Sequence, residues 1–243
     1  MDRTLTELER REIINALRLG AVPGRGLDNL AVGLERFRVA LEEEREHVAL
    51  GHGMFKAVRG EYGSGKTFFS RWLQRTAQRN GFATSEVQSS ETETPLYRLE
   101  TVYRRAMENL QTHDCEQGAF RHLVENWFFR LEEEVLERGD VDEENGDALS
   151  AAVGELLEAR LSHVSATQPQ FAAALRTCHS ARMRGDHAQS EALQAWLMGQ
   201  PHVAAAHKRA AGLKGDIDHF GAMGFLRGLL ALLEQTGRRG LVL

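Results

Sequence analysis

The fold of this chain is decided by the stretch Gly60-Glu61-Tyr62-Gly63-Ser64-Gly65-Lys66-Thr67. The stretch fits the phosphate-binding pattern G-x-x-x-x-G-K-[ST] at every fixed position. Residues 54–59 before it are compatible with a short β-strand, and residues 67–80 after it have the spacing of an amphipathic helix. Gly81 stands where a glycine commonly ends a helix. Strand, glycine-rich loop and helix in this order predict a P-loop rather than a chance glycine-rich turn.

Each residue type in this stretch has a separate chemical task. The three glycines let the backbone turn so that successive N–H groups point at one anion. The helix that begins near Lys66 adds the positive end of its dipole. The Lys66 ammonium would contact the β- and γ-phosphates, and the Thr67 hydroxyl would be the metal ligand that binds Mg²⁺. The predicted site for ATP and Mg²⁺ comprises Gly60, Glu61, Tyr62, Gly63, Ser64, Gly65, Lys66 (the catalytic candidate), Thr67 and Phe68.

The composition is that of an ordinary globular protein. The 243 residues are 42% hydrophobic and 27% charged. A net charge of −5 argues against a protein that coats nucleic acid, although a local basic groove is compatible with it. Cys115 and Cys178 belong to no C-x-x-C pair, which favours a reducing compartment. Because no apolar run approaches the length of a membrane span and the first residues form no signal peptide, we expect a cytoplasmic protein without membrane association.

Helical spacing dominates the chain ahead of the loop. Residues 4–19 and 27–47 predict two helices, separated by a turn rich in glycine at 20–26. Within this turn, Val22 and Pro23 are candidate contacts for the adenine base. The alternative is a plain turn between two helices, which the pattern alone favours.

Beyond the loop, the sequence predicts a second strand and then only helices. Residues 82–87 are compatible with a strand, and residues 240–243 resemble the opening of a buried strand. No strand is expected between residues 96 and 235. The predicted helices there include residues 96–110, 120–135, 149–164, 171–178 and 188–198, with a last one that begins after Asp216 and ends at Gly237.

These elements define the expected fold class and domains. We expect an α/β P-loop NTPase core that is incomplete, with few parallel strands, an N-terminal helical arm and a large all-α insertion, so that the chain is predominantly helical overall. The predicted domains are the helical arm at 1–50, the first part of the nucleotide-binding core at 51–95, the helical insertion at 96–235 and the start of a further strand at 236–243.

An acidic residue that would support hydrolysis is harder to find. P-loop hydrolases place such a residue at the end of a neighbouring strand. The one serious match is Leu229-Leu230-Ala231-Leu232-Leu233-Glu234, and its helical spacing favours a helix core instead. The strand that should carry the acid would begin at Leu241. We therefore expect a chain truncated within this strand, which binds ATP with poor or absent turnover.

Four stretches of the chain match a known family. They are ALRLGAVPGRGL at 16–27, VGLE at 32–35, RGEYGSGKTFF at 59–69 and GRRGLVL at 237–243. On these stretches the chain resembles the BREX phage-defence ATP-binding proteins of the BrxD type, which are P-loop ATPases similar to the initiator-type branch of the AAA+ class. The resemblance implies a helical arm near the base, a helical insertion before the Walker B strand and ATP hydrolysis in the family. It also implies other BREX proteins as partners, DNA contact through the complex and an oligomer as open options.

The resemblance implies that residues 60–67 are the phosphate and Mg²⁺ site, and it favours Val22 and Pro23 as neighbours of the adenine.

Two weaker patterns lie outside this site. Arg71, Arg75 and Arg79 recur at helical spacing and either follow a nucleic-acid backbone or form a solvated face, which we favour. The acidic run at 140–147 departs from the spacing of a calcium loop and is interpreted as a solvated linker.

Two other functions are left open by the residues. In the first, the chain is a nucleotide-gated interaction module or a DNA-associated module, and the helical block at 96–235 is its working surface. In the second, it is a phosphotransferase that uses the same loop, but no acceptor-site base or arginine-bearing lid can be placed in the sequence.

Overall fold

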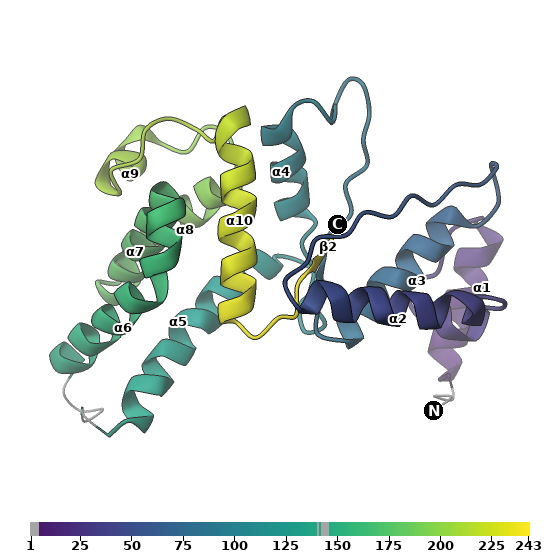
Figure 1. Cartoon of the computed structure of the whole chain (residues 1–243), viewed down its shortest axis with the longest axis horizontal. Helices are drawn as coiled ribbons and strands as arrows, with labels where there is room; N and C mark the ends of the chain where they lie inside the picture. Colours follow the sequence, from purple (N-terminus) through teal and green to yellow (C-terminus); the bar gives the residue numbers. More distant parts are fainter. Residues whose placement is uncertain (1–4, 140, 142–145) are drawn as a thin grey trace. The chain divides into compact units, whose positions relative to one another are not determined.

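The computed structural model describes residues 5–139, 141 and 146–243, and its architecture is predominantly helical (Figure 1). It divides into two compact units, an N-terminal unit (Met1–Asn80) and a C-terminal unit (Gly81–Leu243). Four positions of the acidic run, 142–145, and position 140 lie outside the described residues, and so does their predicted role as a linker.

The N-terminal unit contains short helices and long connections. Its elements are α1 (Glu7–Arg18), the 3₁₀ helix η1 (Leu27–Leu30), α2 (Glu35–Ala49) and α3 (Lys66–Arg79). A capping box begins α1: the Thr6 N–H donates to Glu9 Oε2 at 2.8 Å, and the Glu9 N–H donates to Thr6 Oγ1 at 3.3 Å. The single helix predicted at 27–47 is instead split into η1 and α2. Gly33 lies between them with φ +79°, a left-handed conformation that interrupts a helix.

The strand predicted at residues 54–59 is wrong. These residues are assigned to neither strand nor helix, and their backbone groups form no backbone hydrogen bond with any other described residue. Phe55 and Met54 are exposed. β-compatible side chains supply a preference for extended backbone, but a strand also needs a paired neighbour, and the described residues of the N-terminal unit include no strand.

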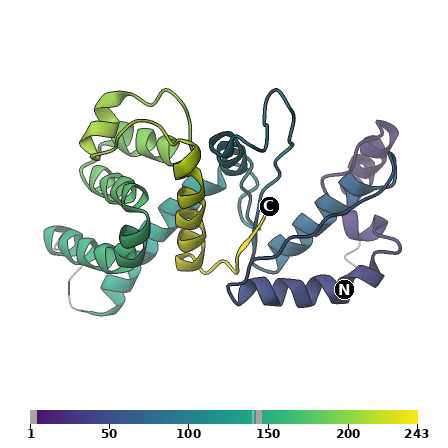
Figure 2. The same cartoon turned by 45° about the horizontal axis from the view of Figure 1, so that its top comes forward.

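The C-terminal unit contains a small parallel sheet. β1 (Ala83–Thr84) pairs with β2 (Leu241–Val242) in the register Ala83 to Leu241 and Thr84 to Val242. Both predicted strands are therefore confirmed, although they are shorter than expected. Figure 2 shows the chain passing from the end of α10 (His219–Gln235) into β2. The whole helical block lies between the two strands in the chain. A parallel pair of strands needs such a long connection.

The other regular elements described in the C-terminal unit are helices, as predicted. They are α4 (Leu99–Glu108), α5 (Ala119–Glu137), α6 (Gly146–Thr167), α7 (Pro169–Met183), α8 (His187–Leu197), α9 (Ala205–Ala210) and α10 (His219–Gln235). The short α9 was not predicted, because six residues show no helical period. α10 begins after Asp218 rather than Asp216, since the Asp218 side chain accepts the N–H of Gly221 at 2.7 Å. The Glu234 match lies inside α10, which confirms the helix interpretation.

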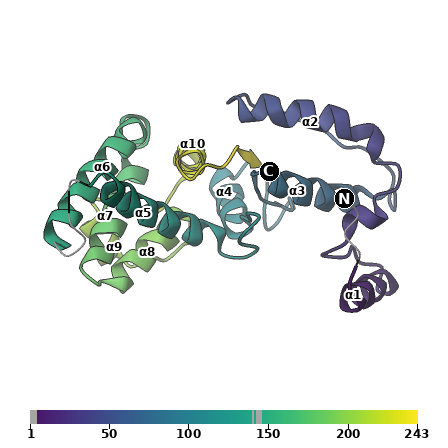
Figure 3. The ribbon, with the colours of Figure 1, turned by 90° about the horizontal axis from the view of Figure 1, so that it is seen from below.

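One large core holds this helical block together. α10 packs against α4 and against α5, α6 and α7, and it lies between α4 and that group in Figures 1 and 3. Trp127 and Phe128 of α5 are buried, whereas Phe129 faces outward. A Cβ at Gly228 would meet the Phe171 ring within 3 Å, so α10 needs glycine there to approach α7. None of the described helices combines the length and the apolar character needed to cross a bilayer.

A candidate phosphate loop and the cavity beside it

The loop at residues 60–67 leads directly into α3 and is exposed. Gly63 and Gly65 have φ of +80° and +87°, in the left-handed region that only glycine adopts without strain, and Gly65 is the N-cap of α3. A Cβ at Gly60 would clash with the Ser64 side chain. The local backbone thus requires glycine at positions 63 and 65, as the sequence pattern anticipates, whereas a side chain at Gly60 would force the Ser64 side chain to move.

The loop presents unpaired amide groups at the helix start. Within the loop, the Ser64 N–H donates to Glu61 O at 3.2 Å. Across the described residues, the N–H groups of Gly63, Gly65, Lys66 and Thr67 have no protein acceptor. Such clustered amides, at the positive end of a helix dipole, attract an anion.

Lys66 is folded back over the same loop. Its ammonium donates to Gly60 O at 2.8 Å and to Glu61 O at 2.7 Å. Thr67 is exposed in the first turn of α3, so its hydroxyl is accessible from solvent. The predicted loop residues are therefore brought together by the fold, as their adjacency in sequence requires. Tyr62 is fully exposed at the tip of the loop.

The arginines of α3 bind the segment that precedes α2. Arg71 Nη1 donates to Val22 O at 2.8 Å, and Arg79 Nη2 donates to Asp28 Oδ1 at 3.0 Å. The hydrogen bonds from Arg79 hold the pKa of Asp28 below its usual value. Arg75 Nη1 donates to Gln78 Oε1 at 3.3 Å. These arginines are engaged within their own unit, and the face is partly solvated, since Arg79 is exposed and Arg71 and Arg75 are half-buried.

Val22 and Pro23 lie in the turn between α1 and η1. Pro23 is buried, and Val22 is half-buried against the small core formed by Leu27, Ala31, Leu41 and Trp72. Neither residue lines the cavity described next. Their contact with adenine stays a prediction.

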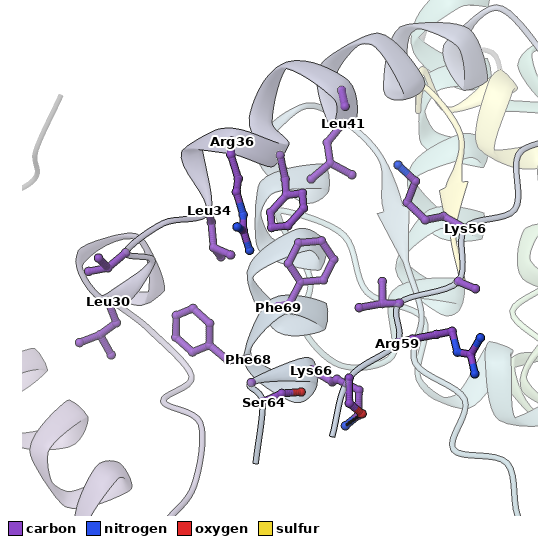
Figure 4. A pocket seen from close by; sticks show the side chains of 17 residues that line it. Leu30, Leu34, Arg36, Leu41, Lys56, Arg59, Ser64, Lys66, Phe68 and Phe69 are labelled. Atoms are coloured by element: carbon purple, nitrogen blue, oxygen red, sulfur yellow. Dashed lines mark hydrogen bonds between the residues drawn. The ribbon is translucent and has the colours of Figure 1, made fainter. Parts of the chain in front are cut away.

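A cavity of about 540 Å³ opens beside the loop (Figure 4). Gly60, Ser64, Gly65 and Lys66 form its end at the loop. Apolar side chains from three elements form much of its wall, namely Leu30 of η1, Leu34, Phe37 and Leu41 around α2, and Phe68 and Phe69 of α3. Figure 4 shows Phe69 pointing toward α2 and Phe68 lying on the side of Leu30.

Cationic side chains surround this apolar wall. Arg36, Lys56, Arg59 and Lys66 all line the cavity. The Arg36 guanidinium lies 4.6 Å from the centre of the Phe37 ring, and Lys56 forms an ion pair with Glu44. Of the lining residues, those of the loop and the start of α3 were among the predicted site residues, namely Gly60, Ser64, Gly65, Lys66 and Phe68. The apolar spacing at 27–47 was the available signal for the others, but it showed only that these residues share a helical face.

A glycine-rich loop that runs into a helix start, with unpaired amides and a lysine over it, is the form of site found in P-loop nucleotide-binding proteins. Comparison with known families matches residues 5–243 to the family described as BREX system ATP-binding protein BrxC/D. The chain belongs to this family, which confirms the resemblance found in the sequence. Neither the curated proteins nor the solved structures contain a match to the chain.

Proposed function

We propose that the protein binds ATP·Mg²⁺ through residues 60–67 and serves as an ATP-binding component of a BREX phage-defence system. The observation that carries the proposal is a set of amides at the positive end of α3, those of Gly63, Gly65, Lys66 and Thr67, for which the described part of the chain offers no acceptor. The family description supports ATP as the ligand and other BREX proteins as partners.

In this proposal Lys66 exchanges its partners when the nucleotide binds. Its ammonium leaves the carbonyl oxygens of Gly60 and Glu61 and donates to phosphate oxygens, where the hydrogen bonds are assisted by charge on both groups. If the assembled system hydrolyses ATP, the same ammonium stabilises the charge that develops on the transferred phosphoryl group, which is its catalytic role.

Thr67 is the proposed protein ligand of Mg²⁺. This ion takes oxygen ligands, keeps several waters and uses few protein groups when phosphates are present. One exposed hydroxyl in the first turn of α3 fits that donor set. The ion would neutralise phosphate charge at the loop.

Replacing Lys66 tests the proposal directly. We expect Lys66→Ala to weaken ATP·Mg²⁺ binding by roughly 10- to 100-fold, because hydrogen bonds to charged groups contribute about 1.5–3 kcal/mol. Isothermal titration calorimetry measures the change, with the exposed Lys214→Ala of the C-terminal unit as a matched loss of one lysine. Equal affinities of Lys66→Ala and the unchanged protein would refute the loop as the binding site.

The same variant separates the alternative function. If nucleotide only locks a conformation in which the helices α4–α10 contact partners, Lys66→Ala should abolish nucleotide-dependent co-purification with other BREX proteins while basal association persists. Loss of nucleotide binding with no change in any association would argue against the gated module. DNA added to the same assay tests whether the assembled complex binds DNA when this chain alone does not.

A further inference from the structure

The helix α10 carries apolar side chains on both its inner and its outer face. The inner face buries Phe225, Leu229 and Leu233 in the core of the C-terminal unit. On the outer face, Phe220 is 89% exposed and Leu230 is 42% exposed. A helix that is apolar all round is normally covered all round. The outer face of α10 therefore has the character of an interface rather than of a surface in contact with water.

The exposed residues on this outer face form a single stripe along the helix. They recur at alternating intervals of three and four residues, which is the spacing of a seam between two packed helices. The outer stripe of α10 consists of Phe220, Met223, Arg227, Leu230 and Glu234. Figure 3 looks along α10 and shows one of its sides free of the other described helices of the C-terminal unit.

The exposed face of α5 provides a comparison within the same unit. It consists largely of charged residues, among them Arg121, Glu125, Glu133 and Glu137, with Phe129 as the exposed apolar residue. Such a composition is that of a solvated helix face. The outer stripe of α10 reverses it, because three of its five residues are apolar.

The two charged residues of the outer stripe have no counterpart within the chain. Across the described residues, the side chains of Arg227 and Glu234 form no hydrogen bond and no ion pair. They are seven positions apart, so about 10 Å separates them along the helix axis, too far for them to pair with each other. Leu230 lies between them, three positions after Arg227 and four before Glu234.

We propose that the outer stripe of α10 is the contact surface for a second copy of this chain. The two α10 helices lie antiparallel, with a two-fold axis beside Leu230. Arg227 of each copy then lies opposite Glu234 of the other, so that both charges are paired twice, and the two Leu230 side chains meet. A two-fold interface requires such self-complementarity.

The placement of the charges also decides between this arrangement and its alternatives. A parallel pair of α10 helices would set Arg227 against Arg227 and Glu234 against Glu234, which is unfavourable. A helix of a different protein could cover the apolar residues, but it would need no opposite charges at matched distances on either side of Leu230. A second copy uses both charges.

The size of the surface sets the strength of the dimer. The 17 residues of α10 span about 25 Å at 1.5 Å per residue. One pair of such helices is smaller than the interface of a permanent dimer, which buries roughly 2,000 Å² or more. The dimer therefore dissociates on dilution. Its surface lies in the C-terminal unit and does not involve the phosphate loop, so the inference stands apart from the proposed function.

Reversal of the charges tests the pairing. The measurement is sedimentation equilibrium of the full chain without nucleotide, over a series of protein concentrations. Arg227→Glu and Glu234→Arg should each weaken the dimer roughly 5- to 30-fold, because two exposed ion pairs become two repulsions. An equimolar mixture of the two variants should associate as tightly as the unchanged protein, because each copy then carries the charges that the other lacks. The double variant should also recover.

Two further variants separate the stripe from other surfaces. Leu230→Asp places a charge beside the axis and should abolish the dimer. Arg209→Glu is the matched control, since it reverses an exposed arginine of α9 outside the stripe, and it should leave the dimer unchanged.

Four outcomes would overturn the inference. The first is an unchanged protein that stays monomeric up to its limit of solubility. The second is a dimer that Leu230→Asp does not weaken, and the third is one that Arg209→Glu weakens as much as Arg227→Glu does. The fourth is a mixture of the two charge variants that fails to associate more tightly than either variant alone. This mixture also guards against misfolding, because two misfolded variants would not restore each other.

Discussion

The two units of the molecule bury apolar side chains to very different extents. In the C-terminal unit, α5, α6, α7, α8 and α10 contribute to one extensive core with several fully buried aromatic rings. In the N-terminal unit, the buried cluster consists of Leu27, Ala31, Leu41 and Trp72. α1 buries Ile13, whereas its Leu8 and Leu17 are exposed. The candidate site therefore lies in the unit with the smaller core.

The candidate site and most of the buried core are therefore formed by different parts of the sequence. Binding loops are commonly drawn from the less stable parts of proteins, where few apolar contacts hold the backbone. The exposed loop, the segment 54–59 and the cavity all belong to the N-terminal unit. The helical core supplies most of the buried apolar area instead. We expect the two units to respond differently to substitution, ligand and pH.

Removing the largest side chain of the small core should have the largest effect. Trp72 is 3% exposed, so Trp72→Ala should cost about 3–5 kcal/mol and unfold the N-terminal unit. Differential scanning calorimetry and limited proteolysis should show that the transition of the C-terminal unit is retained. Phe128→Ala, a comparable truncation in α5, should lower the other transition. If Trp72→Ala lowers one joint transition of the whole chain, the separation fails.

Binding of ATP·Mg²⁺ should stabilise the N-terminal unit and so reduce the difference in stability between the two units. At a concentration of ATP·Mg²⁺ 100 times the dissociation constant, the N-terminal unit should gain about 2.7 kcal/mol of stability. Hydrogen exchange should slow in the loop and in α3, and it should change little in the α5–α8 core. Lys66→Ala should remove the protection. Protection confined to α5–α8 would contradict the assignment of the site.

Lowering the pH should reduce the stability of the C-terminal unit, by a smaller amount than the effects above. His179 is 5% exposed, its Nε2 has no partner among the described residues, and its ring contacts Phe128. Burial, followed by the charge of Arg182, lowers the pKa of His179. The unfolded chain therefore binds the proton more readily. Stability is present above the ordinary pKa of about 6.5 and is lost as the pH falls below it toward the lowered value.

Denaturant titrations at pH 7.5 and pH 5.5 measure this loss. His179→Leu should flatten the slope of unfolding free energy against pH, whereas His187→Gln, which removes an exposed histidine of the same unit, should leave it unchanged. An unaltered slope in His179→Leu would show that this residue is not the titrating group.

The smallest effect is expected for the ion pair in the N-terminal unit. Asp28→Asn removes the charge that Arg79 contacts, and because both side chains are partly exposed the loss should be only a few tenths of a kcal/mol. The pKa of Asp28 is lowered, so the contribution is present above pH 4 and is lost as the pH falls through the lowered value. A double-mutant cycle with Arg79→Gln measures the coupling. A coupling of zero would show that Asp28 and Arg79 do not support one another.

Much of this molecule could be predicted from patterns in short stretches of its sequence. The glycines and the lysine of the loop, the helix that follows it and Gly81 with φ +83° at its end all depend on residues adjacent in the chain. The helices α5 and α10 show their periodicity over many residues, so they could be predicted, and so could the apolar start of β2. Short-range preferences and repeated spacing are properties of sequence alone.

Tertiary contacts decided the rest. Whether residues 54–59 pair as a strand depends on a neighbour, and composition does not specify one. The bonds from Arg71 to Val22 and from Arg79 to Asp28 join positions about fifty residues apart, so spacing along α3 could not reveal them. The cavity arises only because η1, α2, α3 and the segment before the loop enclose a common space. The phosphate loop is thus encoded by neighbouring residues, whereas the space beside it exists only when distant segments pack together.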